Sequence, residues 1–491
     1  SFEFLYTLSM PSKQIATSTL WQMGSQITMA ALSILTVKFV AIGLTKELAG
    51  NYNSAYGYLQ LFGILADFGL YAVSVREVSK AKDKSKVLGA LIVLRTMILI
   101  VSLGAALLLV WAMPQWRGTP LPMSVMIASL VPFFTLLAGI IRTVFQVNYK
   151  LQYVFLAEVT QRIITTGLIG SFIVLGVRQS TDLQHLHMML FFGGVGAFIL
   201  FVISLFYGNR LMKIRLTVDK TLIKDLAKKA APFGLAYLCL AFYRQFDITM
   251  IAMLRPDFEI QNAYYGFVVR MADMAFLLPT FLLNSTLPVL SERDNNGEDT
   301  RALLGKTFMS IMLIGVTAFL FAALWSRPLI ALLTTQQYLS TELTPGADTA
   351  LRLVSIPFLL NGVILYSFYV LLNRHVWKRL TLTLFGAAII SLTLNFILIP
   401  LHGFVGAAYT SIVVHVLLAA ALLPQALKEM PMQLDRDLIR KWAIFGMGLG
   451  LGLALFKPVL VNELSTVIGL VAMTILMGTL GWTLRLHKSL L

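Results

Sequence analysis

Long apolar runs separated by short polar stretches recur along the whole chain, and an α-helix needs roughly 20 apolar residues to cross a bilayer. The first run is too long, and lacks the small-residue cleavage site, for a removable signal peptide. Residues 1–9 are expected to be a non-native extension before Met10 and are left out of the argument. Fourteen transmembrane segments are predicted, near 17–42, 51–74, 87–112, 121–146, 153–176, 186–207, 231–254, 262–288, 306–325, 350–372, 380–399, 403–424, 442–456 and 463–484.

Composition supports a membrane protein and excludes several other classes. Of 491 residues, 58% are hydrophobic and 13% are charged, about half the charged fraction of a soluble domain, and the mean hydropathy is +0.80. Soluble enzymes, secreted disulfide scaffolds and DNA-binding domains do not have this composition. Cys239 is the single cysteine, so disulfides and cysteine metal sites are excluded as well.

Basic residues lie mostly in alternate connections between the predicted segments. With a cytoplasmic N-terminus, one set of connections holds 27 Lys and Arg, and the opposite set holds Lys46, Arg117, Arg178, Arg255, Arg327 and Lys457. Positive connections favour the cytoplasmic side, so both termini are predicted to be cytoplasmic. The net charge of +16 is therefore explained by an anionic leaflet, without nucleic acid.

The chain also contains a weak internal repeat. The hexapeptide beginning at Asn53 (NSAYGY) matches the one beginning at Asn262 (NAYYGF), an offset of 209. Val87-Leu88-Gly89 matches Leu303-Leu304-Gly305 at an offset of 216. Six predicted segments separate the copies, which indicates two parallel six-helix halves. The expected organisation is a cytoplasmic N-terminus (1–15), an N-lobe (16–207), a basic linker (208–230), a C-lobe (231–424), and a C-terminal helix pair with a cytoplasmic tail (425–491).

Ionisable side chains inside apolar segments are expensive and mark functional sites. Arg244 and Asp247 are i,i+3 on one predicted segment, and Arg270 and Asp273 repeat this spacing on the next, so each pair is expected to share a helical face. These pairs predict a polar cavity between the lobes. The full set of such residues is Lys38, Asp67, Arg95, Glu158, Arg162, Arg244, Asp247, Arg270, Asp273 and Arg352.

The predicted cavity suits a ligand that carries phosphate. Arginine binds phosphate bidentately and stays charged, and aspartate partners would keep the ligand from binding too tightly. Glu158 and Arg162 are i,i+4 and form a weaker candidate pair. The alternative is that these ion pairs only hold the helices together, and that Lys38 extends its ammonium to the membrane surface.

Other residue patterns carry less weight. Tyr56 and Tyr265, with their neighbouring tyrosines, could stack on sugars, although an aromatic belt at the membrane interface is favoured. His185 and His187 lack a third metal ligand. The glycines from Gly446 to Gly452 indicate close helix packing rather than a nucleotide loop. The sequence contains none of the common catalytic signatures, so the protein is not expected to be an enzyme.

Three local sequences resemble those of the Wzx-type polysaccharide flippases. They are ATSTLW from Ala16, LADFGL from Leu65, and Val75-Arg76-Glu77. These flippases belong to the multidrug/oligosaccharidyl-lipid/polysaccharide (MOP) exporter superfamily, which includes the lipid II flippases and the multidrug (MATE) antiporters. The resemblance implies two lobes in a V shape, alternating access, and a central cavity lined by segments one, two, seven and eight. The ionisable residues on those segments are Lys38, Asp67, Arg244, Asp247, Arg270 and Asp273.

The resemblance implies a function in the bacterial inner membrane. The expected activity is to move an undecaprenyl-pyrophosphate-linked oligosaccharide, such as an O-antigen, lipopolysaccharide or capsule repeat unit, from the cytoplasmic to the outer leaflet. The polysaccharide polymerase machinery would then be a partner, and no cofactor is expected. Because no ATP-binding motif is present, H⁺, Na⁺ or the membrane potential would supply the energy, with Asp67, Asp247 and Asp273 as the responsive groups.

Two other functions remain open. A MATE-like antiporter of organic cations would favour an acidic cavity, which the surplus of arginine opposes. A membrane glycan polymerase or ligase would need a substantial outer loop, whereas the longest, at about 326–349, has few ionisable groups.

Overall fold

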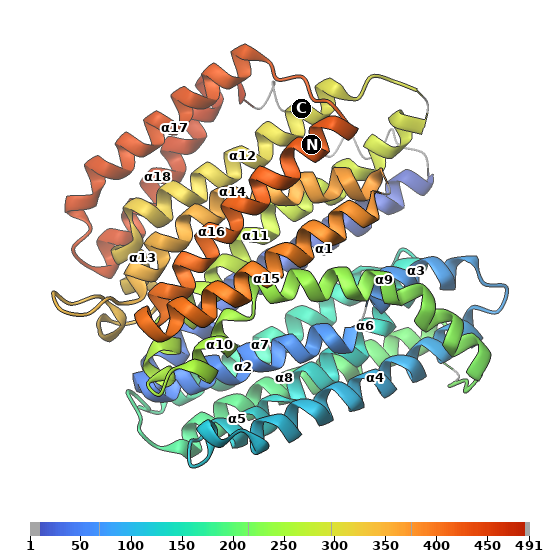
Figure 1. Cartoon of the computed structure of the whole chain (residues 1–491), viewed down its shortest axis with the longest axis horizontal. Helices are drawn as coiled ribbons and strands as arrows, with labels where there is room; N and C mark the ends of the chain where they lie inside the picture. The colour runs from blue at the N-terminus through green and yellow to red at the C-terminus, as the bar shows by residue number, and fades with distance from the viewer. Residues whose placement is uncertain (1–9, 68, 215, 296, 375, 487–491) are drawn as a thin grey trace. The chain divides into compact units, whose positions relative to one another are not determined.

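The computed structural model describes residues 10–486 except 68, 215, 296 and 375. The expected extension 1–9, the basic residues Arg215 and Lys488, and the repeat residue His375 lie outside this part of the chain. The described residues form only helices, turns and one isolated bridge between Leu44 and Ser180, with no strand. Figure 1 shows the helices in chain order. They are α1 (Met10–Gly43), α2 (Lys46–Asp67), α3 (Leu70–Lys80), α4 (Lys84–Ala112), α5 (Leu121–Ala128), α6 (Leu130–Val147), α7 (Gln152–Val174), α8 (Leu183–Leu211), α9 (Lys220–Arg244), α10 (Asp247–Leu254), α11 (Phe258–Asn295), α12 (Arg301–Leu324), α13 (Ser326–Leu333), α14 (Ala347–Asn373), α15 (Trp377–His402), α16 (Phe404–Glu429), α17 (Arg436–Phe456) and α18 (Glu463–Thr483).

Each of the fourteen predicted segments coincides with helical structure. Ten helical stretches of the described chain are long and apolar enough to cross a membrane. The other four segments, 51–74, 153–176, 231–254 and 262–288, also lie mostly in helices. The chain is therefore an all-α, multi-pass membrane protein, as the hydrophobic pattern predicted.

Three predicted segments are interrupted: 121–146 at Ser129 between α5 and α6, and 51–74 and 231–254 at clearer breaks. Between α2 and α3, Gly69 has a φ of 70°, in the left-handed region that glycine adopts most readily. Between α9 and α10, Gln245 and Phe246 are not helical. The prediction that Arg244 and Asp247 share a face of one continuous helix is therefore wrong, because α9 ends at Arg244 and α10 begins at Asp247.

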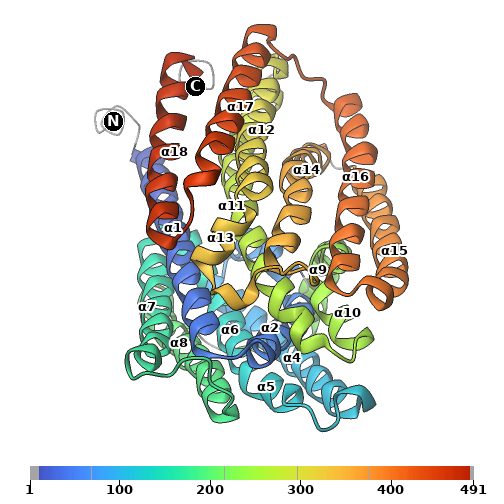
Figure 2. The same cartoon turned by 90° about the vertical axis from the view of Figure 1, so that its left-hand side faces the viewer.

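The chain divides into two compact units, residues 1–262 and 263–491. In the first unit, α1 packs against α7, α6 against α8, and α2 against α4 and α5. Figure 2 shows the neighbouring helices α7 and α8 of this unit.

The boundary between the units differs from the predicted basic linker at 208–230. Helix α8 continues to Leu211 and α9 begins at Lys220, so the connection is shorter than expected. Leu226 and Ala230 of α9 are buried in a cluster with Val78 of α3 and Leu88 of α4. The apolar face of α9 therefore places this helix with the first unit.

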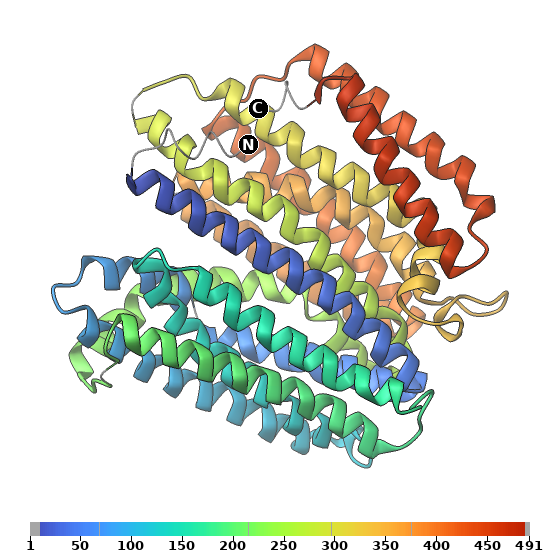
Figure 3. The same ribbon diagram turned by 180° about the vertical axis from the view of Figure 1, so that it is seen from behind.

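The second unit contains the C-terminal helix pair. Its helix α14 packs against α12 and α16, and α17 packs against α12 and α18. Figure 3 shows α17 and α18, in red, side by side. Trp325 is fully buried, and its indole Nε1 donates to the main-chain oxygen of Leu453 at 2.8 Å. This bond joins α17 to the segment between α12 and α13.

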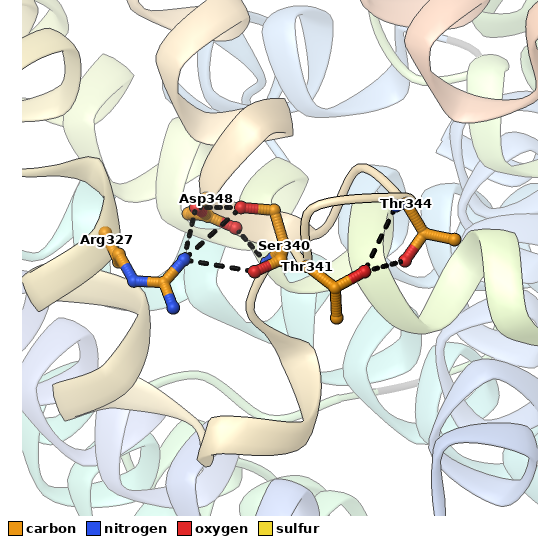
Figure 4. A network of polar contacts seen from close by, with 5 residues as sticks. All are labelled: Arg327, Ser340, Thr341, Thr344 and Asp348. Atoms are coloured by element: carbon orange, nitrogen blue, oxygen red, sulfur yellow. Dashed lines mark hydrogen bonds and ion pairs between the residues drawn. The ribbon is translucent and has the colours of Figure 1, made fainter.

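The connection between α13 and α14 is folded (Figure 4). Asp348 accepts from both the main-chain nitrogen and the hydroxyl of Ser340, each at 2.7 Å. Arg327 Nη1 donates to the main-chain oxygen of Ser340 at 3.0 Å. Thr341 and Thr344 close the turn with hydroxyl groups 2.8 Å apart. The longest predicted outer loop, about 326–349, thus contains helix α13 followed by an ordered turn.

Candidate functional site

A buried ion pair lies at the break between α2 and α3. Asp67 is the last residue of α2, and its carboxylate is paired with the guanidinium of Arg95 on α4. The side chain of Arg95 is 3% exposed, whereas that of Asp67 is 28% exposed. Arg95 lies within the apolar span Lys84–Ala112, where an unpaired charge would be costly.

A second ion pair joins α6 and α7 of the same unit. Arg142 Nη1 of α6 donates to Glu158 Oε1 of α7 at 2.8 Å, and Ser25 Oγ of α1 donates to Glu158 Oε2 at 2.5 Å. Helix α6 lies beside both pairs, because Gly139 faces the guanidinium of Arg95 about one helical turn before Arg142. We call Asp67, Arg95, Arg142, Glu158 and Ser25 the polar band of the first unit.

The polar band corrects several expected partners. Glu158 is bonded to Arg142 of α6, a partner that the sequence had not suggested. Asp67 is bonded to Arg95, which the sequence made only a minor candidate. In both pairs the partners carry opposite charges on consecutive apolar segments, a signal that the sequence contains. Which of these charges form a pair depends on how the helices pack. Arg352, by contrast, is exposed near the start of α14.

The other candidate charges lie on α1, α9, α10 and α11. Lys38 is half-buried on α1, and Arg244 is half-buried at the end of α9. Asp247 is 4% exposed at the start of α10. Arg270 and Asp273, both half-buried, lie on the continuous helix α11 and keep their expected i,i+3 relation.

Most of the tyrosines near the predicted segment ends are buried between helices. Tyr52, Tyr58, Tyr264 and Tyr265 are all buried, and the hydroxyl of Tyr58 donates to the main-chain oxygen of Ala106 at 2.7 Å. Tyr56 is half-buried, and its hydroxyl lies close to the backbone of Gly193 on α8. These rings pack between helices, so Tyr265 has no free face for a sugar in this conformation.

An apolar groove runs along the second unit between α12, α14 and α17. It has a volume of about 670 Å³ and is lined by Val316, Phe319, Leu320, Leu359, Trp442, Ala443, Gly446, Met447, Gly450 and Leu451. The alternating glycines of α17 have two roles. Gly448 and Gly452 lie against Leu480 and Leu476 of α18, whereas Gly446 and Gly450 leave space toward α12.

The described side chains offer little for a metal ion. They contain no group of three or more His, Cys, Asp or Glu residues placed to hold one. His185 Nδ1 is 2.7 Å from the hydroxyl of Ser180, which gives this histidine a structural contact near the start of α8. The two candidate features are therefore the ion pairs of the polar band in the first unit and the apolar groove in the second unit.

The fold defines a class of protein. The chain resembles the solved structure of the lipid II flippase MurJ in an inward closed conformation, with a TM-score of 0.71 and 14% identity over 96% of this chain and 99% of that one. It also resembles an inward-facing MATE multidrug transporter of the MOP superfamily, with a TM-score of 0.64 and 12% identity over 84% and 98% of the two chains. A MOP superfamily transporter from Pyrococcus furiosus matches with a TM-score of 0.60 and 14% identity over 86% and 96%. The fold is therefore that of a MOP-type transporter.

The sequence identifies the family more closely. Residues 15–293 match the polysaccharide biosynthesis protein family, and the chain belongs to this family. No curated protein sequence matches the chain.

Proposed function

We propose that this protein moves a polyprenyl-pyrophosphate-linked oligosaccharide from the cytoplasmic to the outer leaflet by alternating access. The observation that carries the proposal is the apolar groove of α12, α14 and α17. A long isoprenoid chain needs an extended apolar surface, whereas a small organic cation does not. Membership of a polysaccharide biosynthesis family and the likeness to a lipid II flippase support a lipid-linked glycan as the cargo.

Arginine supplies the proposed phosphate contacts. Arg244 and Arg270 are half-buried, and each can present a planar fork to phosphate that lysine cannot reproduce. Lys38 is a further proposed contact, and Asp247 and Asp273 would moderate the affinity. We assign no catalytic residue, because the proposed step is transport without a bond being made or broken.

The proposed direction rests on charge. The basic connections would face the cytoplasm, with both termini on that side. An ion gradient or the membrane potential would drive net export, and Asp67, with its partly exposed carboxylate, is a proposed responsive group. The polymerase machinery that consumes exported repeat units is the proposed partner.

Transport in proteoliposomes tests the function directly. The purified protein is given a panel of fluorescent polyprenyl-pyrophosphate oligosaccharides, and transfer between leaflets is measured by an impermeant quencher. Wild type should accelerate the transfer of at least one substrate, while Arg244→Ala and Arg270→Ala should lose most of this activity. Arg→Lys should restore only part of it.

Two results would decide against the proposal. Export of organic cations without movement of any lipid-linked oligosaccharide would favour an antiporter. Full activity in both alanine variants would remove the two arginines as phosphate contacts. The exposed residue Arg352 provides a matched control, because Arg352→Ala should leave transfer unchanged.

A further inference from the structure

A polar groove in the first unit lies between the start of α4, with the connection before it, and the connection from α8 to α9. Helix α3 ends at Lys80, α4 begins at Lys84, α8 ends at Leu211 and α9 begins at Lys220. The groove has a volume of about 580 Å³ and is lined by Asp83, Ser85, Lys86, Met212, Lys213 and Thr217. Neither the polar band nor the apolar groove includes any of these residues.

Both aspartates near this groove already have partners. The Lys86 ammonium lies 3.0 Å from Asp219 Oδ2, and Asp219 also accepts from the hydroxyl of Thr221 at 2.6 Å. The bond from Thr221, then that from Lys86, holds the pKa of Asp219 well below its usual range, so this carboxylate stays ionised. Asp83 caps α4 by accepting from the main-chain nitrogen of Lys86 at 3.0 Å.

The basic side chains exceed these carboxylates. Lys213 is exposed, and among the described residues no acidic group lies within ion-pair distance of it. Lys82 and Lys84 are also exposed beside the groove. The groove therefore has a surplus of positive charge, with Lys213 available to an anion.

Helix α8 ends one residue before the groove residue Met212 and carries a stripe of apolar side chains in its C-terminal half. Phe198, Val202, Leu205 and Phe206 are exposed large hydrophobic residues at helical spacing. The guanidinium of Arg210 lies 4.1 Å from the centre of the Phe206 ring, at the point where the apolar stripe gives way to the basic connection. A molecule that fits both parts must be anionic at one end and apolar at the other.

We propose that this groove binds the headgroup of an anionic phospholipid, with the phosphate at Lys213 and Lys86 and the acyl chains along the apolar stripe of α8. Basic pockets at helix ends are a common way for membrane proteins to hold acidic lipids. A free phosphate ion would use the lysines but not Phe198, Val202 or Phe206. The stripe is therefore the observation that favours a lipid over an ion.

Native mass spectrometry of the delipidated full-length protein tests this inference. The probes are dioleoylphosphatidylglycerol, dioleoylphosphatidylcholine and inorganic phosphate, each titrated in the same detergent. The anionic lipid should bind several-fold more tightly than the neutral lipid. Lys213→Gln should weaken its binding about fivefold, the usual effect of one lysine at an anionic surface.

The matched control is Lys428→Gln, which removes an exposed lysine from α16 and should not change binding. Lys86→Gln should weaken binding at least as much as Lys213→Gln, because it also leaves Asp219 without its lysine. Equal binding to wild type, Lys213→Gln and Lys428→Gln would overturn the proposal. So would displacement of the anionic lipid by inorganic phosphate at equal concentration. Neither measurement depends on transport, so this inference can fail without affecting the proposed function.

Discussion

Asn53 Nδ2 donates to the main-chain oxygen of Asn262 at 3.1 Å, although the two residues are 209 positions apart. This separation equals the offset of the two matching hexapeptides, so equivalent positions of the internal repeat contact each other. Asn262 Nδ2 in turn donates to Ser54 Oγ at 2.9 Å and to the main-chain oxygen of Ile248 at 3.0 Å. We call Asn53, Ser54 and Asn262 the asparagine seam.

The backbones at this seam are also close. A Cβ at Gly50 would lie 1.6 Å from the main-chain oxygen of Glu259, so only glycine lets α2 come this near to the first turn of α11. The asparagines and Gly50 therefore serve the same contact. The two matching hexapeptides therefore contact each other, and each supplies one side of the asparagine seam.

The first prediction concerns the asparagine seam. Asn262→Ala removes two donated bonds from a fully buried residue, and we expect it to destabilise the protein by about 1–3 kcal/mol. Thermal unfolding in detergent measures this. Ser54→Ala combined with Asn262→Ala should cost less than the sum of the single changes, whereas strictly additive effects would contradict the seam. Gly63→Ala, which meets open space on α2, is the control.

The second prediction concerns pH and Glu259. This residue accepts from Asn51 Nδ2 at 2.6 Å, and burial raises its pKa above the ordinary 4.5, with the Asn51 bond opposing the shift and Glu47 adding to it. The folded state therefore holds the carboxyl proton of Glu259 more tightly than the unfolded chain does. The stability that this protonation contributes is complete below pH 4.5 and is lost as pH rises through the raised pKa.

Glu259→Gln keeps an acceptor for Asn51 without the charge. It should melt at a higher temperature than wild type at about pH 8 and at the same temperature near pH 4. Melting curves across this range check the prediction, with the exposed Glu342→Gln as the control. A difference that does not change with pH would show that Glu259 is not the group responsible.

The sequence predicted the helices better than the contacts between their polar residues. The pattern of apolar residues predicted helical segments along the whole chain, because each segment has a long apolar surface that packs in the protein or faces lipid. It did not locate the break at Gln245 and Phe246, because neither residue is a helix breaker such as glycine or proline. It also could not choose Arg95 as the partner of Asp67, because that choice depends on how α4 packs against α2.

The third prediction concerns the apolar groove of α12, α14 and α17. A Cβ at Gly450 would lie 3.7 Å from Leu320, an ordinary contact, whereas a Cβ at Gly452 would lie only 2.6 Å from Leu476 of α18. Gly450→Leu should fill the groove and lower transport about tenfold or more, equivalent to roughly 1.4 kcal/mol of lost binding, with little change in melting temperature. Gly452→Leu should instead destabilise the helix pair by about 1–3 kcal/mol.

Gly478→Leu serves as the matched control for both glycine variants, because Gly478 lies on α18 with open space around it. It should change neither transport nor melting temperature. Normal transport by a well-folded Gly450→Leu protein would show that the groove is not on the path of the substrate.

The fourth prediction concerns orientation in the membrane. The native Cys239 is buried, so single introduced cysteines can be labelled with little background. Gln115→Cys and Thr344→Cys should react with an impermeant thiol reagent added outside intact cells, whereas Lys220→Cys should react only after the cells are opened. All three positions are exposed. External labelling of Lys220→Cys would reverse the proposed topology.

The last prediction concerns the pair of Asp67 and Arg95. Removing one partner of a buried pair leaves an uncompensated charge, so Arg95→Met alone should cost about 3–5 kcal/mol. Asp67→Asn combined with Arg95→Met should recover most of this stability, because no charge then remains. Thermal unfolding of the single and double variants measures the recovery. Arg142→Met on α6 and Glu158→Gln on α7, made singly and together, provide the matched comparison.

The same double variant separates ion coupling from structural support. If the Asp67 carboxylate exchanges Arg95 for a cation during transport, the folded double variant should still equilibrate substrate slowly but should ignore an imposed pH or sodium gradient that accelerates wild type. If the pair only supports the fold, the double variant should keep this acceleration. The greater exposure of Asp67 than of Arg95 favours coupling, since a cation can approach the carboxylate while the guanidinium stays buried. Wild-type transport that responds to neither gradient nor voltage would remove Asp67 as a coupling group and leave the pair with a structural role alone.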